Sequence, residues 1–144
     1  MKRLLIAVAV GSVLALGGCK KQENPEETQR DVAKAQAEAK KDVAQEQAKL
    51  EKNRADQQQD LAKAERKGDA EDVADAQKDL QKTEAKGQKE VNEEKVEGDY
   101  KVAKERCEGL PAAQQGPCKD QAKAEYDRAK DEVKRQKEAQ MPKQ

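Results

Sequence analysis

The sequence lacks the side chains from which most active sites are built. It contains no His, Trp or Phe, and its one Ser, Ser12, lies close to the N-terminus. The rest of the chain therefore cannot form a Ser-His-Asp or Cys-His nucleophilic site, a histidine metal site, or an aromatic platform for sugars or bases. A glycine-rich phosphate loop is absent as well. We expect a protein that is not an enzyme, with no catalytic, metal or cofactor-binding residues and no cofactor.

Large apolar residues are also scarce. The 144 residues are 42% charged and only 1% aromatic, and the mean hydropathy is −1.26. Burial of apolar surface, at about 25 cal/mol per Å², cannot offset the roughly 1–2 kcal/mol of backbone entropy per residue that a compact domain loses. Such a chain is either disordered or built of extended helices. Ala, Lys, Glu and Gln dominate, and these residues favour helix, so we expect an all-α protein of long, loosely packed or coiled-coil-like helices.

Neither sign of charge is in excess. The chain has 30 Lys and Arg against 30 Asp and Glu, and the two signs are interleaved. A nucleic-acid-binding protein needs a basic face, and a membrane-binding polybasic patch needs clustered Lys and Arg. We therefore expect no nucleic acid among the partners.

The longest apolar run stands at the N-terminus. Lys2 and Arg3 precede an apolar run from Leu4 to Leu16, and small residues lead to Cys19. This order is typical of a secretory signal peptide, and the run is shorter than the about 20 residues of a transmembrane helix. The N-terminus therefore predicts export from the cytoplasm.

Leu16-Gly17-Gly18-Cys19 resembles the lipobox of bacterial lipoproteins. The resemblance implies that residues 1–18 are a signal peptide, that Cys19 carries palmitate and related acyl chains, and that residues 19–24 are a lipidated tether. Two or three acyl chains anchor a protein stably to a membrane. Lys20, rather than Asp, follows the cysteine, which implies an outer membrane lipoprotein facing the periplasm; the inner membrane stays open. The alternative is an ordinary secretory signal with a chance cysteine.

The body of the chain is predicted to be helical. Asn24 is suited to an N-cap and Pro25 to the first helical position, and the next Gly is Gly68, so a helix is expected over 25–67. Gly68 fits the end of that helix and Asp69 fits the cap of the next.

Glycine and proline mark the remaining boundaries. A second helix is expected over 70–106, weakened at Gly87 and Gly98, and a third from about residue 119 to residue 140. The segment between the second and third helices is predicted to be a loop because it holds Gly109, Pro111, Gly116 and Pro117.

The larger apolar residues form one thin line on each of the first two helices. They are Val32, Val43, Leu50 and Leu61 on the first helix, and Val73, Leu80, Val91 and Val102 on the second. If the chain folds back at Gly68, Leu80 lies near Gln57 and Val91 near Glu46, so large residues do not face one another. A loose hairpin, a coiled-coil homo-oligomer of modest stability and largely solvated extended helices all remain open.

Cys107 and Cys118 are expected to form a disulfide that closes an antiparallel helical hairpin over 95–140. Metal ligation and a redox pair are disfavoured because the chain has no CxxC motif and no His. Across the hairpin, positions whose numbers sum to about 225 lie opposite one another. The predicted packing residues are Val96, Tyr100, Ala103, Ala122, Tyr126 and Ala129.

Residues 100–107 and 118–126 resemble a two-cysteine segment of small exported Ala/Lys-rich proteins of proteobacteria. No activity is established for these proteins, so the resemblance implies only the helical hairpin and the cysteine pairing.

The function expected from these features is that of a non-catalytic cell-envelope lipoprotein. A helical stalk or adaptor would hold the disulfide-closed hairpin at its far end, for contact with an envelope protein or, non-covalently, with peptidoglycan. In plan the chain is similar to murein lipoprotein, although it ends Pro142-Lys143-Gln144. Two alternatives are open: a desiccation-protective protein similar to the late-embryogenesis-abundant type, and an accessory subunit of a secretion or efflux assembly.

Overall fold

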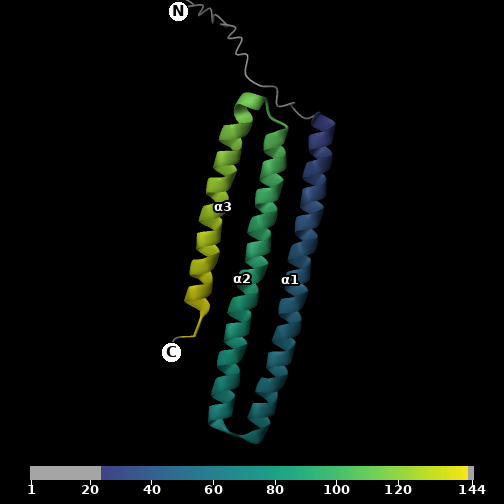
Figure 1. Ribbon diagram of the computed structural model, residues 1–144. Coiled ribbons are helices and arrows are strands. Elements are labelled where there is room, and N and C mark those ends of the chain that lie inside the picture. The colour runs from purple at the N-terminus through teal and green to yellow at the C-terminus, as the bar shows by residue number, and fades with distance from the viewer. Residues whose placement is uncertain (1–23, 143–144) are drawn as a thin grey trace, which may run out of the picture.

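Three long helices make up the part of the protein that the structure describes. The computed structural model describes residues 24–142, which form α1 (Pro25–Lys67), α2 (Ala70–Glu108) and α3 (Ala112–Gln140). The three helices run side by side, alternating in direction (Figure 1). The all-α fold expected from composition is confirmed. The predicted signal peptide (1–18) and the predicted lipidation site, Cys19, lie outside the described residues.

Local capping sets both the start of α1 and the turn between α1 and α2. At the start of α1, the side chain of Asn24 accepts a hydrogen bond from the backbone N–H of Glu26, at 3.2 Å. Gly68 ends α1 with a φ of 76°, in the left-handed region that favours glycine. The Asp69 carboxylate then accepts the N–H of Glu71 at 2.9 Å and begins α2. Because Gly68 stops one helix and Asp69 starts the next, the chain reverses sharply.

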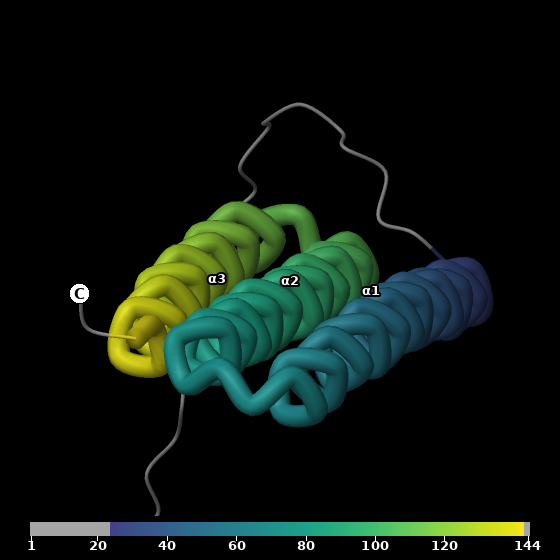
Figure 2. The backbone as a smooth tube through the Cα atoms, turned by 90° about the horizontal axis from the view of Figure 1, so that it is seen from below, coloured from purple at the N-terminus to yellow at the C-terminus, as the bar shows by residue number. Residues whose placement is uncertain are grey.

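The helices form a single layer with α2 in the middle. α2 packs against both α1 and α3, and α1 and α3 do not pack against each other within residues 24–142. Viewed from below the molecule of Figure 1, the three helices stand in one row (Figure 2). The layer therefore encloses no central core. Burial is confined to two interfaces, here called the α1–α2 seam and the α2–α3 seam. The buried apolar residues are mostly small: Ala35, Ala64, Ala85, Val91, Val102, Cys107, Ala122 and Val133.

Glycines on α2 allow α1 to approach closely. A Cβ atom added to Gly87 would overlap the side chain of Leu50, and one added to Gly98 would overlap the Cβ of Ala39. From the sequence, these glycines are expected to weaken the second helix, but α2 continues through both. Their lost helix propensity, about 1 kcal/mol each relative to Ala, is the cost of the close contact.

The α1–α2 contacts recur at a constant interval. Thr28 faces Gly109, Ala39 faces Gly98 and Leu50 faces Gly87. On both helices each contact is therefore the eleventh residue from the one before. This interval corresponds to three turns at about 3.67 residues per turn, which keeps the contacts in line along nearly straight helices. Large residues do not face large ones, as expected, but at these three positions a glycine of α2 gives room to the α1 residue that faces it.

The expected loop between the two cysteines is shorter than predicted. α3 begins at Ala112 rather than near residue 119, so Gly116 and Pro117 lie inside the helix. Pro117 removes one N–H, which deprives the carbonyl of Ala113 of its helical partner. Ala113 is exposed, so water can replace that bond, and the helix tolerates the proline.

The disulfide-closed end lies beside the start of α1. Gly109, which caps α2, is in contact with Thr28 in the first turn of α1, and the Gly68 turn stands at the opposite end of the layer (Figure 1). The expectation that the disulfide-closed hairpin lies at the far end of a stalk that begins at Pro25 is therefore wrong, because α2 returns along the whole length of α1. α3, at 29 residues, is shorter than α1, at 43 residues, so the α1–α2 hairpin extends beyond it.

Candidate functional site

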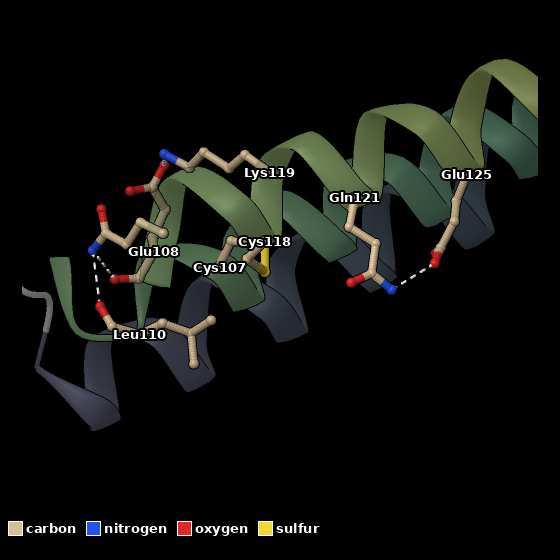
Figure 3. The surroundings of a disulfide bond; sticks show 8 residues. Cys107, Glu108, Leu110, Cys118, Lys119, Gln121 and Glu125 are labelled. Atoms are coloured by element: carbon tan, nitrogen blue, oxygen red, sulfur yellow. Dashed lines mark hydrogen bonds and ion pairs between the residues drawn. A yellow bond between two sulfur atoms is a disulfide. The ribbon is translucent and has the colours of Figure 1, made fainter. Parts of the chain in front are cut away.

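The disulfide joins the last turn of α2 to the second turn of α3. The Cα atoms of Cys107 and Cys118 are 5.7 Å apart, and Cys107 is only 1% exposed. Figure 3 shows the two cysteines between α2 and α3. The residues that follow them, Glu108 and Lys119, form an ion pair. The predicted pairing is confirmed, and the two cysteines are separated by 11 positions in the sequence. In the chain-entropy model such a bond stabilises a fold by about 3 kcal/mol.

Gln115 completes this end of the molecule, and sequence reasoning missed it. Its side chain is 6% exposed, and its Nε2 donates to the carbonyls of Glu108, at 2.9 Å, and Leu110, at 3.0 Å. Glu108 is the last residue of α2, where the helix leaves its C=O groups without helical partners, and Leu110 follows two residues later. Gln115 thus acts as a side-chain cap supplied by the following helix. One Gln among many gives no sequence signal for this role.

Tyr100 and Tyr126 stack across the α2–α3 seam. Their ring centroids are 4.7 Å apart, with an interplanar angle of 27°. Lys104 lies 4.8 Å from the centroid of Tyr100, and Lys130 lies 5.5 Å from that of Tyr126. Cation–π contacts of this kind contribute about 0.5–1 kcal/mol when exposed. The tyrosine pair is therefore an aromatic contact covered by ammonium groups rather than an open platform for a ligand.

The six packing residues predicted for the hairpin line one shallow pocket. Val96, Tyr100 and Ala103 of α2 meet Ala122, Tyr126 and Ala129 of α3 around a hollow of about 220 Å³. Asp99 and Glu125 also line the pocket, and the sequence prediction does not include either residue. Both are exposed. The pocket has apolar walls and an acidic rim, which suits contact with a side chain of a partner more than catalysis.

Two lysines of α3 have a raised pKa. Hydrogen bonding to Asp127, whose Oδ2 is 2.6 Å from Nζ, raises the pKa of Lys123. Hydrogen bonding to Tyr126 raises the pKa of Lys130, which also lies 3.8 Å from Glu97. Since a lysine with a raised pKa stays cationic at neutral pH, these groups offer charge and no general base.

Residues 24–142 present neither a cluster of metal ligands nor a membrane-spanning helix. That part of the chain has no group of three or more His, Cys, Asp or Glu side chains placed to hold a metal ion. It also has no helix long and apolar enough to cross a membrane.

Comparison of the chain with protein families, with curated proteins and with solved structures finds no match.

Proposed function

We propose that the chain is a non-catalytic lipoprotein of the cell envelope that acts as a helical adaptor. Cys19 anchors it to a membrane, and the helical layer contacts an envelope protein or, non-covalently, peptidoglycan. One observation carries the proposal: the lipobox-like Leu16-Gly17-Gly18-Cys19 stands shortly before a capped helix start at Asn24 and Pro25. A folded rod follows the proposed anchor with only a short tether between them.

The shape of the rod supports a role in contact rather than chemistry. α1 has 43 residues and is therefore about 65 Å long, at 1.5 Å per residue. With the tether at the Pro25 end, the disulfide-closed hairpin stands near the membrane and the Gly68 turn stands away from it. A partner of the hairpin would thus be met close to the membrane.

Anchoring is tested by metabolic labelling with palmitate and by cell fractionation. The expected result is label on the wild-type chain, recovery with the outer membrane, and loss of both in Cys19→Ala. Cys107→Ala, which changes a cysteine of the disulfide, is the matched control and keeps the label. A wild-type chain that stays unlabelled, or that retains residues 1–18, would overturn the proposal of a lipoprotein.

The adaptor role is tested by photo-crosslinking in cells. A photoreactive residue placed at Glu125, on the rim of the α2–α3 pocket, is expected to capture one dominant envelope partner. The same residue at Lys63, near the opposite end of the layer, is the control for random contacts. Equal capture of many proteins from both positions would contradict a defined adaptor contact at the hairpin.

A further inference from the structure

The two outer flanks of α1 differ sharply in charge. One flank, here called the charged flank, is mostly charged and includes Arg30, Lys41, Lys52, Lys63, Glu38 and Asp60. The other, here called the low-charge flank, carries two columns in which the same residue type returns at every eleventh position: Ala33, Ala44 and Ala55, and beside them Gln36, Gln47 and Gln58. All six are exposed. In a chain that is 42% charged, a flank built of Ala and Gln needs an explanation beyond solubility.

The low-charge flank borders an apolar groove between α1 and α2. Near the start of α1 the groove has a volume of about 440 Å³, with Val32 and Leu110 among its walls. Further along, it continues as a hollow of about 290 Å³ beside Val43 and Ala44. Both hollows are open at the surface of the described part of the chain, so an element laid on the flank would cover apolar surface as well as alanine.

Two copies of α1 match each other along this flank when they run antiparallel. With the two-fold axis between residues 45 and 46, the numbers of facing positions sum to 91. Each Gln then faces an Ala of the other copy: Gln36 faces Ala55, Gln47 faces Ala44, and Gln58 faces Ala33. The α1–α2 seam follows the same rule, since there too a larger side chain meets a small one at every eleventh residue of an antiparallel pair.

The charges on the flank select the same arrangement. Glu51 is the eleventh residue after Lys40, so the two lie in line with each other between the Gln and Ala columns. Neither forms an ion pair within residues 24–142. Their numbers sum to 91, so the antiparallel arrangement brings Lys40 of each copy opposite Glu51 of the other. A parallel arrangement in register would bring Lys40 against Lys40 and Glu51 against Glu51.

We propose that the low-charge flank of α1 is a self-association surface, on which a second copy of this chain docks antiparallel. Alanine opposite glutamine allows close approach of the two helices, the groove beside the flank is covered, and two reciprocal Lys40–Glu51 ion pairs set direction and register. Ion pairs covered by an interface add little net affinity, because desolvation offsets their attraction, but like charges in the same places are unfavourable, so such pairs determine which arrangement forms.

The pairing goes beyond the proposed function and does not rest on it. If the chain is also anchored, the two tethers stand at opposite ends of the pair, because Pro25 of each copy faces Arg66 of the other. A pair with both tethers in one membrane would then lie lengthwise on it. A single chain that stands on the membrane and a pair that lies along it would present different surfaces to other proteins.

A charge-swap experiment tests the pairing. The full chain, in a density-matched mild detergent, is studied by sedimentation equilibrium as wild type, Lys40→Glu, Glu51→Lys, and the double swap. Each single change places like charges opposite each other twice and is expected to weaken dimerisation about tenfold. The double swap is expected to restore it. A wild-type chain that is monomeric throughout, or a double swap no better than the single changes, would overturn the proposal.

A second pair of variants separates pairing from folding. Ala44→Glu puts a charge at the centre of the flank and is expected to abolish the dimer, while Gln45→Glu makes a similar change on the charged flank and leaves it intact. Both positions are exposed, so circular dichroism should show both variants as helical as the wild type. Equal dimerisation of the two variants would place the interface elsewhere and contradict the proposal. Loss of palmitate label in Cys19→Ala bears on anchoring alone, so the two proposals can fail separately.

Discussion

The two seams of the molecule hold their helices together by different means. The α2–α3 seam has a covalent bond between Cys107 and Cys118 and a stacked tyrosine pair, Tyr100 and Tyr126. The α1–α2 seam has no such anchors in the described chain and relies on small residues opposite larger ones at regular intervals. The comparison teaches that a chain with few apolar side chains can fold either by covalent closure of a short hairpin or by shape matching along a long one.

The largest expected effect comes from removing the covalent closure. The double variant Cys107→Ala/Cys118→Ala should lose about 3 kcal/mol of unfolding free energy in the α2–α3 hairpin. Hydrogen exchange should show faster exchange in α3 while the α1–α2 hairpin keeps its protection, since its seam is separate. Uniform loss of protection over all three helices would show that the two seams do not act separately.

Adding a side chain to a glycine in the α1–α2 seam should have the next largest effect. Gly98→Leu places a side chain where Ala39 already lies, and overpacking of this kind costs about 1–3 kcal/mol. The loss should be measurable by urea unfolding followed by circular dichroism. Hydrogen exchange should show that backbone protection is lost first along α1. Ala74→Leu is the control, because Ala74 lies on the same helix as Gly98 and is exposed. Equal destabilisation by the two changes would refute a close α1–α2 contact at Gly98.

The tyrosine pair should contribute less. Tyr126→Leu keeps an apolar side chain but removes the stacking, which is worth about 0.5–1.5 kcal/mol. The double-mutant cycle of Tyr100→Leu and Tyr126→Leu, measured by thermal unfolding, should give a coupling energy in that range. A coupling energy of zero would mean that the two rings do not contact each other in solution.

The smallest expected effect comes from an alanine at Gly116. No neighbouring helix lies near a Cβ at this position, but the new Cβ would crowd Pro117, the next residue, so Gly116→Ala is expected to change the unfolding free energy by less than about 1 kcal/mol. Gly98→Ala makes the same chemical change where Ala39 already lies, so it should destabilise the protein more than Gly116→Ala does. Urea midpoints of the two variants compare them directly, and equal midpoints would contradict the close contact at Gly98.

Sequence reasoning succeeds where a single residue type carries a local signal. Asn24, Pro25, Gly68 and Asp69 bound helices because their own backbone and side-chain chemistry starts or stops a helix, and the structure uses each in that way. The disulfide could be predicted because an antiparallel hairpin places Cys107 opposite Cys118, and the chain has no CxxC motif and no His to suggest another use for them.

The rest depends on tertiary context. The regular spacing of Gly87, Gly98 and Gly109 is visible in the sequence, but a glycine marks a close contact only once its partner helix is placed. Pro117 is typical of a loop, because nothing local shows that Ala113, whose carbonyl loses its helical partner, is exposed. The cap formed by Gln115 could not be predicted, since it depends on the direction in which α3 leaves α2.

The α1–α2 register is the central claim, and one measurement tests it most directly. In the isotope-labelled full chain, nuclear Overhauser effects should link the methyl groups of Leu50 to the Hα atoms of Gly87, and the methyl group of Ala39 to the Hα atoms of Gly98. Both contacts are close in the structure, so both signals should be strong in dilute buffer. Their absence, as in a chain that is disordered until dried, or signals from Leu50 to another part of α2, would contradict this fold.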